Sequence, residues 1–244
     1  ILVTFDMRTS GLYIHIPFCA SKCIYCDFYS VVDQYNKIDS FVESLIHEIN
    51  GNDIDVSNWK FDTIFIGGGT PSLLSAIQLE NIINTLQNKF DLSNIIEFTL
   101  EANPGEAPFD KLVCFRELGV NRLSIGIQSF KQHLLQFLSR IHTTEDAINT
   151  FDNARKVGFD NINCDIIYNI PNQSLDDWKD DLNQLSKLNP EHISAYSLTV
   201  ESGTELDELI QSDKIKMPRD ENHLYFNTTA FAILKKNDFF QYEI

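Results

Sequence analysis

Short β-rich runs alternate with amphipathic segments along most of this 244-residue sequence, and this alternation is the feature that most limits its fold. The β-rich runs span residues 12–16, 61–66, 95–101, 122–128, 161–167 and 192–199. The amphipathic segments between them lie near 38–49, 76–89, 109–118, 145–157 and 175–188. Strands that alternate with helices of about 10 to 15 residues are typical of repeated βα units on a parallel sheet. Six units fit, and no low-complexity linker divides them, so we expect one α/β domain.

Polar or small residues occupy every second position of three successive predicted strands: Glu97, Thr99, Glu101, Ser124, Gly126, Gln128, Asn163 and Asp165. Because side chains two positions apart share a face, each strand has an apolar face for helices and a polar face that looks elsewhere. A closed eight-stranded barrel fills its interior with branched apolar side chains. A polar interior therefore predicts an open, partial barrel that holds a ligand at the carboxyl ends of its strands. The alternative is that each polar residue is a hydrogen-bonded core group.

The C-terminal part of the sequence departs from this alternation. Two polar helical segments follow, at 205–216 and 221–235, and residues 242–244 are expected to begin a new strand. The sequence opens with Ile1, and Met7 would serve as a native start. We therefore expect a lead-in at 1–11, a partial-barrel core at 12–204, and the start of a C-terminally truncated region at 205–244.

Three of the five cysteines, Cys19, Cys23 and Cys26, directly follow the first predicted strand, where a parallel βα fold presents its active site. Cys114 and Cys164 lie in apolar surroundings and are read as small buried hydrophobic residues. An odd count with this clustering argues against a disulfide framework and indicates a metal site. Structural zinc takes four protein ligands and this loop supplies three, whereas three thiolates suit a [4Fe–4S] cluster with one open iron. An incomplete zinc site and free thiols are the alternatives.

A second motif, Gly67-Gly68-Gly69-Thr70-Pro71, ends the second predicted strand. Successive glycines let the backbone approach a ligand closely, and Pro71 can start the next helix. The motif lacks the GxGxxG and GK[ST] patterns of dinucleotide and P-loop sites. By itself such a turn is as often structural as ligand-binding.

The charge balance excludes one class of function. With 19 Lys and Arg against 35 Asp and Glu, the net charge is −16, which argues against a nucleic-acid-binding domain. The sequence contains no run of about 18 apolar residues that would span a membrane. It does not open on a charged-then-apolar signal peptide, so the expected localisation is cytoplasmic.

The cysteine loop reads CxxxCxxC with an aromatic residue, Tyr25, before the last cysteine, and in this it resembles the radical S-adenosylmethionine (SAM) superfamily. In that superfamily the three thiolates hold a [4Fe–4S] cluster, and the amino and carboxylate groups of SAM chelate the fourth iron. Electron transfer then breaks SAM into methionine and a 5′-deoxyadenosyl radical. The resemblance implies a TIM-like partial (β/α)6 barrel of parallel strands, here followed by C-terminal helices.

Further motifs resemble the oxygen-independent coproporphyrinogen III oxidase family: the segments 13–19, 67–71, 100–104, 124–129, 165–168 and 196–199. Within that family, Cys26-Asp27-Phe28 matches the CxxCDF form of the HemW-type heme-chaperone branch, whereas oxidases carry CxxxCxxCxC. The chain also lacks the long segment that oxidases carry before the first strand. The resemblance implies a heme chaperone that delivers heme to acceptor proteins such as respiratory enzymes. The alternatives are a coproporphyrinogen III oxidase, which decarboxylates two propionates by radical chemistry, and a fragment with a structural metal alone.

The resemblance also implies roles for individual residues. The cluster ligands would be Cys19, Cys23 and Cys26. The residues matching SAM-contacting positions are Tyr13, Gly68, Gly69, Thr70, Glu101, Gln128, Arg140, Asp165 and Thr199. Arg140 is expected beside the SAM carboxylate, since a guanidinium suits a carboxylate, and its alternative is a solvated charge at a helix end. The resemblance leaves the catalytic residues unassigned.

The histidines do not form a heme site by spacing. His15 shares the inward face with Tyr13, and His142 is expected to order its turn. The others are read as surface or packing residues: His47, His133, His192 and His223. The heme-chaperone branch carries an HNxxYW segment beyond the point where this chain ends, so heme is expected as a cofactor of the full-length parent. The charge of −16 also disfavours the tRNA-modifying radical SAM enzymes and gives anionic propionates no general attraction.

Overall fold

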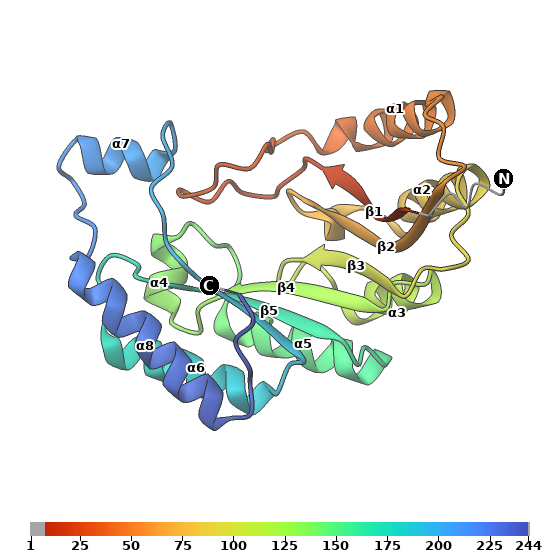
Figure 1. The fold of residues 1–244 in the computed structure, drawn as a ribbon. Helices are drawn as coiled ribbons and strands as arrows, with labels where there is room; N and C mark the ends of the chain where they lie inside the picture. The colour runs from red at the N-terminus through yellow and green to blue at the C-terminus, as the bar shows by residue number, and fades with distance from the viewer. Residues whose placement is uncertain (1–7, 244) are drawn as a thin grey trace, which may run out of the picture.

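The computed structural model describes residues 8–243. Within them, six parallel strands form one sheet whose spatial order is the order along the chain. The strands are β1 Arg8–Ile16, β2 Trp59–Gly68, β3 Glu97–Ala102, β4 Arg122–Gln128, β5 Ile162–Tyr168 and β6 His192–Ser197. Figure 1 shows the sheet curling into an open half-barrel with helices along its outer face. The predicted fold class, a partial barrel of parallel βα units, is confirmed.

Helices connect the strands and follow the last one. Their bounds are α1 Ile38–Gly51, α2 Ala76–Lys89, α3 Phe109–Glu117, α4 Gln132–Phe137, α5 Thr144–Val157, α6 Leu175–Leu188, α7 Glu205–Gln211 and α8 Asp220–Lys236. Two short 3₁₀ helices lie at Tyr35–Lys37 and Pro71–Leu73. Helix α8 packs along α6, where the Trp178 indole N–H donates to the Phe226 carbonyl at 2.9 Å. The predicted C-terminal helices are therefore present, although α7 ends at Gln211 and not at residue 216.

Several element bounds differ from the sequence expectations. Three further features are new or start elsewhere than expected. Strand β1 starts at Arg8 rather than residue 12, because residues 8–10 also pair with β2 before a register shift at Gly11. The short helix α4 was not predicted, since six residues are too few to establish a helical period. The predicted new strand at 242–244 is wrong for its described part: Tyr242 and Glu243 lie outside any strand, while Ile244 lies outside the described residues.

The main core fills the space between the sheet and its helices. It takes the side chains that alternate with the polar ones, such as Ile14 and Ile16 on β1 and Leu123, Ile125 and Ile127 on β4, each at most 5% exposed. Because these apolar side chains all face the helices, the opposite face of the sheet is left to polar groups. The packing thus fixes which side chains look into the barrel.

A smaller core supports the cysteine loop. Ile24, between two of the cysteines, is buried against Leu134 of α4 and Leu206 of α7. The Leu206 N–H also donates to the Ile24 carbonyl at 2.9 Å. The loop is therefore held by elements from both the barrel and the segment that follows it.

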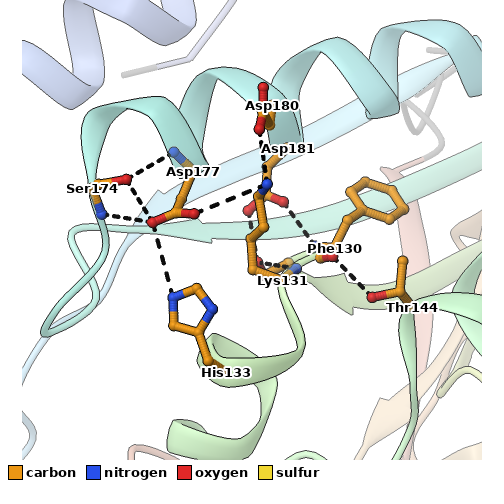
Figure 2. A network of polar contacts seen from close by, with 9 residues as sticks. Phe130, Lys131, His133, Thr144, Ser174, Asp177, Asp180 and Asp181 are labelled. Atoms are coloured by element: carbon orange, nitrogen blue, oxygen red, sulfur yellow. Dashed lines mark hydrogen bonds and ion pairs between the residues drawn. The ribbon is translucent and has the colours of Figure 1, made fainter.

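A buried carboxylate fixes the turn after β4 to helix α6 (Figure 2). Asp181 is fully buried; it accepts the Ser129 hydroxyl at 2.7 Å and the Phe130 N–H at 2.9 Å. Nearby, Lys131 forms an ion pair with Asp180 at 2.8 Å. Burial raises the pKa of Asp181 to about 6, although the two hydrogen bonds oppose this rise. The turn that follows Gln128 is thus anchored by Asp181, whose pKa is higher in the folded protein than in the unfolded chain.

Asp181→Asn is expected to flatten part of the pH dependence of stability. The folded-state pKa lies above the unfolded one, so the Asp181 contribution is most favourable below pH 4 and declines as pH rises through 6. Asparagine has no charge; its amide oxygen can accept the Phe130 N–H, and its amide nitrogen donates to Ser129 Oγ in place of accepting from it. The free energy of unfolding of the variant, relative to the parent, should increase by about 1 kcal/mol between pH 5 and pH 8 in urea titrations. Parallel profiles for the two proteins would contradict this assignment.

Candidate functional site

A pocket opens at the carboxyl ends of the strands, between the cysteine loop and the barrel interior. Its lining comes from every strand except β1 and from the loops after β1, β2, β3 and β4: Cys19, Ser21, Lys22, Cys23, Tyr25, Cys26, Phe28, Ser30, Gly68, Gly69, Thr70, Glu101, Ala102, Asn103, Ser124, Gly126, Gln128, Arg140, Asp165 and Tyr196. The predicted polar strand faces reach this pocket, because Glu101, Ser124, Gln128 and Asp165 all line it. The expectation of a polar barrel interior is confirmed for these positions.

The three clustered cysteines line one wall of the pocket as free thiols. Burial raises the pKa of the Cys19 and Cys26 thiols. The positive charge of bound iron would lower both pKa values again. Among residues 8–243, no three His, Cys, Asp or Glu side chains converge closely enough to hold a single metal ion. In an iron–sulfur cluster each thiolate binds a different iron, so three thiols without a fourth Cys or His in the pocket lining fit a cluster better than structural zinc, which takes four ligands.

A chain of polar groups joins two of these thiols. Thr70 Oγ1 lies 3.7 Å from Cys19 Sγ and accepts the Asn103 amide at 3.0 Å. The Asn103 Oδ1 in turn accepts Arg140 Nη2 at 2.5 Å, and Arg140 Nη1 lies 3.5 Å from Cys23 Sγ. The Thr70 hydroxyl lowers the pKa of the Cys19 thiol, against the effect of burial, and so favours the thiolate that a metal ligand requires.

Arg140 is a pocket residue and not a solvated helix-end charge. Besides Asn103 and Cys23, its guanidinium donates to the Gly126 carbonyl at 2.9 Å. A Cβ on Gly126 would lie 3.2 Å from Arg140 Nη2 and 3.0 Å from the Gln128 amide, so glycine makes room for both. A fixed guanidinium beside the pocket can pair with a carboxylate of a ligand.

The glycine turn is folded against the start of the cysteine loop. The Gly69 N–H donates to the Ile16 carbonyl at 2.8 Å and the Thr70 N–H to the Phe18 carbonyl at 2.7 Å. Gly68 has φ of 113°, a conformation that favours glycine. The turn therefore brings backbone close to the cysteines.

Gly68→Ala is expected to lower the free energy of unfolding by more than the backbone strain alone would. A Cβ there would lie 2.5 Å from the His15 ring, which is held at both nitrogens by Tyr13 OH at 2.9 Å and the Tyr29 carbonyl at 2.8 Å. Gly119 has a similar φ of 96° with open space around it, so Gly119→Ala is the matched control. We expect a loss of about 1 kcal/mol for the control and at least about twice that for Gly68→Ala in urea unfolding. Equal losses would show that the contact with His15 does not matter.

Two carboxylates give the opposite wall of the pocket an acidic character. Glu101 accepts the Gly68 N–H at 3.0 Å. Burial raises the pKa of Glu101 to about 7. The negative charge of Asp165 adds to this rise, whereas the hydrogen bond from Gly68 opposes it. Burial likewise raises the pKa of Asp165. Ligand hydroxyl or ammonium groups would supply the hydrogen bonds and positive charge that favour the ionised forms.

Gln128 and Tyr196 close the inner side of the pocket. Gln128 is buried, has φ of 66°, and its Oε1 accepts the Tyr196 hydroxyl at 2.9 Å. Tyr196 was not among the predicted site residues, although it lies in the quoted 196–199 segment and shares strand parity with Ser194. Asn103 and Ser124 were also not assigned, and the signals for them were the 100–104 segment and the alternation of β4.

Several residues singled out from the sequence lie elsewhere. Tyr13 is 60% exposed and bonded to His15, and Thr199 is exposed beyond the end of β6, so both lie outside the pocket lining. His142 is buried; burial and the neighbouring Arg140 lower its pKa to about 4, and its Nε2–H donates to the Ile127 carbonyl at 3.1 Å. It therefore orders its turn as a neutral ring, as expected. Cys164 is fully buried, as its apolar segment predicted.

The residues present fit the cofactors that the sequence implies. Three thiols with donors beside them suit a [4Fe–4S] cluster that lacks a fourth protein ligand. A guanidinium, two carboxylates, an amide and a glycine turn surround the adjoining space and match the carboxylate, ammonium and hydroxyl groups of SAM. When bound, the pair would supply one-electron chemistry at this wall of the barrel.

Comparison with known proteins agrees with this site. The model of the radical SAM superfamily matches residues 13–185. The heme chaperone HemW of Lactococcus lactis is 35% identical over 237 residues, covering 97% of this chain and 62% of that protein. The corresponding protein of Escherichia coli is 40% identical over 195 residues, covering 80% and 52%.

A solved structure is also similar over nearly the whole chain. The coproporphyrinogen III oxidase HemN from Escherichia coli, described as a radical SAM enzyme, has a TM-score of 0.84 at 27% identity and covers 96% of this chain and 54% of its own. The chain thus spans less than two thirds of the length of these relatives. By the family match, the fold and the cysteine pocket, the chain belongs to the radical SAM superfamily, and the two sequence relatives described above are named heme chaperone HemW.

Proposed function

We propose that this chain is the cofactor-binding part of a heme chaperone that carries a [4Fe–4S] cluster on Cys19, Cys23 and Cys26 and binds SAM beside it. The observation that carries the proposal is the single pocket in which three thiols, Arg140 and the glycine turn meet. We infer the heme-chaperone activity from the sequence relatives, which are named heme chaperone HemW. The expected partners are SAM, heme or a related tetrapyrrole, and heme-accepting respiratory proteins.

The proposed SAM contacts follow from what lines the pocket. Arg140 would pair with the SAM carboxylate, and Glu101 and Asp165 would accept from its ammonium and ribose hydroxyl groups. The Gly68 and Gly69 backbone, Thr70 and Gln128 complete the set. Tyr13 and Thr199 remain candidates through the resemblance alone, because both lie outside the lining.

The second candidate function is that of an oxygen-independent coproporphyrinogen III oxidase, favoured by the structural similarity to HemN. The position of the additional cysteine of oxidases is occupied here by Phe28, which is 71% exposed at the pocket. A phenyl ring cannot replace a thiol as a metal ligand or hydrogen donor. This difference supports the chaperone proposal.

No helix within residues 8–243 is long and apolar enough to cross a membrane. We place the protein in the cytoplasm, because clustered free thiols persist in a reducing compartment.

The two candidates are separated by a paired assay on the full-length protein after anaerobic reconstitution. A heme chaperone is expected to bind heme in a stable stoichiometric complex and transfer it to an apo-acceptor, without forming vinyl groups from coproporphyrinogen III. An oxidase would form vinyl groups with consumption of SAM. Vinyl formation without stable heme binding would overturn the chaperone proposal in favour of the oxidase.

A further inference from the structure

A fully hydrogen-bonded asparagine lies directly beneath the pocket. Asn163 on β5 is 2% exposed, and strand register places it beside Ser124 of β4 and His192 of β6. Its Nδ2 donates to Ser124 Oγ at 2.7 Å and to Asp165 Oδ1 at 2.8 Å. Its Oδ1 contacts Ser194 Oγ at 3.0 Å and His192 Nδ1 at 2.5 Å. Both donors and both acceptor sites of the amide are therefore used.

The neighbours fix the direction of each hydrogen bond. The Asn163 amide nitrogen must face Asp165, because an amide oxygen there would oppose a carboxylate oxygen. The Oδ1 then accepts from His192 Nδ1–H, which leaves Nε2 of the neutral ring as an acceptor. The Tyr242 hydroxyl, 2.5 Å from His192 Nε2, donates to it. Burial and the charge of Arg122 lower the pKa of His192, consistent with a neutral ring.

All of these hydrogen bonds point the same way, toward Asp165. The chain runs from the exposed Tyr242 through His192 and Asn163 to the Asp165 carboxylate, and Ser124 Oγ adds a contact to Asp165 Oδ2 at 3.3 Å. Aligned hydrogen bonds polarise one another, so each donor strengthens the next. Asp165 is the group that this chain presents to the pocket.

We infer that Asn163, supported by His192 and Tyr242, is a positioning residue that holds Asp165 as an oriented, ionised acceptor for SAM. Neither Asn163 nor His192 lines the pocket, so both act through Asp165. The inference rests on the proposed SAM site and adds to it a set of residues that reaches the opposite end of the barrel. It also gives a role to His192, which the sequence had indicated only as a surface or packing residue.

The test compares Asn163→Leu, His192→Phe and Tyr242→Phe in the anaerobically reconstituted full-length protein, with SAM affinity measured by calorimetry. We expect the dissociation constant for SAM to rise about 10-fold for Asn163→Leu, about 3-fold for His192→Phe and least for Tyr242→Phe, with iron content unchanged. Thr85→Val is the matched control, because Thr85 is a buried polar residue that bonds only within α2. The control is expected to lose stability and keep its SAM affinity.

The pH profile of SAM affinity distinguishes positioning from a general loss of stability. Removing the Asn163 donors should raise the pH midpoint governed by Asp165 by about one unit. The titratable and charged groups that influence Asp165 come from all four neighbouring strands: Glu101 of β3, Arg122 of β4, Cys164 of β5, and His192 and Tyr196 of β6. They are the same in both proteins, so the difference between the profiles reports Asp165.

Each outcome bears on one assignment. If Asn163→Leu behaves like Thr85→Val, with SAM affinity and pH midpoint unchanged, the positioning role is overturned. If Asn163→Leu does not fold, the graded effects of His192→Phe and of the exposed Tyr242→Phe decide, and their absence overturns it equally. Asp165→Asn separates the proposed SAM contact from the positioning role of Asn163. Parental SAM affinity in that variant would refute the SAM contact itself. A weakened Asp165→Asn beside an unaffected Asn163→Leu would refute only the inference.

Discussion

Cys23→Ala is expected to abolish the cluster, with iron falling from about four per chain to near zero after anaerobic reconstitution and desalting. Cys23 is one of three thiols on the pocket wall, and no fourth cysteine lines that wall to replace it. Its sulfur is also the one that Arg140 approaches, at 3.5 Å. Loss of this ligand would leave two irons without protein thiolates. SAM cleavage to 5′-deoxyadenosine should disappear with the iron.

Cys114→Ala is the matched control for this experiment. Cys114 is a free, half-buried thiol on α3, outside the pocket lining. It should keep full iron and sulfide content. A Cys23→Ala protein that retained a complete cluster, or a Cys114→Ala protein that lost it, would refute the assignment of the ligands.

Arg140→Leu is expected to weaken SAM binding by about 10²- to 10³-fold, or about 3 to 4 kcal/mol. The substitution removes the guanidinium proposed to pair with the SAM carboxylate. It also leaves the Gly126 carbonyl and the Asn103 oxygen without their donor and gives the pocket an excess of negative charge from its carboxylates. Arg140→Lys should fall between the parent and Arg140→Leu, because lysine keeps the charge and loses the planar fork. Calorimetric titration with SAM measures all three.

Arg155→Leu separates this effect from the general cost of removing a partly buried arginine. Arg155 donates to the Phe159 carbonyl at 3.0 Å and pairs with Glu191 at 2.8 Å, far from the pocket lining. Its removal should lower the melting temperature and leave SAM affinity at the parental value. Comparable SAM affinities in Arg140→Leu and Arg155→Leu would remove Arg140 from the site.

The sequence was sufficient to predict the order of elements and the inward faces of the strands, because both depend on local periodicity. The alternation at Ser124, Gly126 and Gln128 correctly indicated a polar interior. The start of β1 was harder to predict, since residues 8–10 are polar and pair with β2 only beyond a shift at Gly11. Such pairing depends on the partner strand and leaves no period in one strand alone.

Site residues that belong to a recognised sequence motif could be predicted. Residues whose role depends on a contact with a distant segment could not. Asn103 lies within a quoted segment, yet its role depends on Thr70 and Arg140, which reach it from distant loops. Asn163 and His192 are likewise joined only by strand register. A single sequence carries no record of these pairings, because they arise when the sheet forms. The prediction of His192 as a surface or packing residue therefore missed its hydrogen bond to Asn163.

The contact between Ile24 and Leu206 has a consequence for the order of synthesis. The cysteine loop leaves the ribosome long before the segment that carries Leu206, whose N–H and side chain complete the support of the loop. Domains form from the N-terminus as the chain emerges, but a contact this distant along the chain forms late. The three thiols are consequently synthesised early and enclosed last. Delivery of the proposed cluster would then follow synthesis of the segment that carries Leu206, and until that point the thiols would depend on the reducing power of their surroundings.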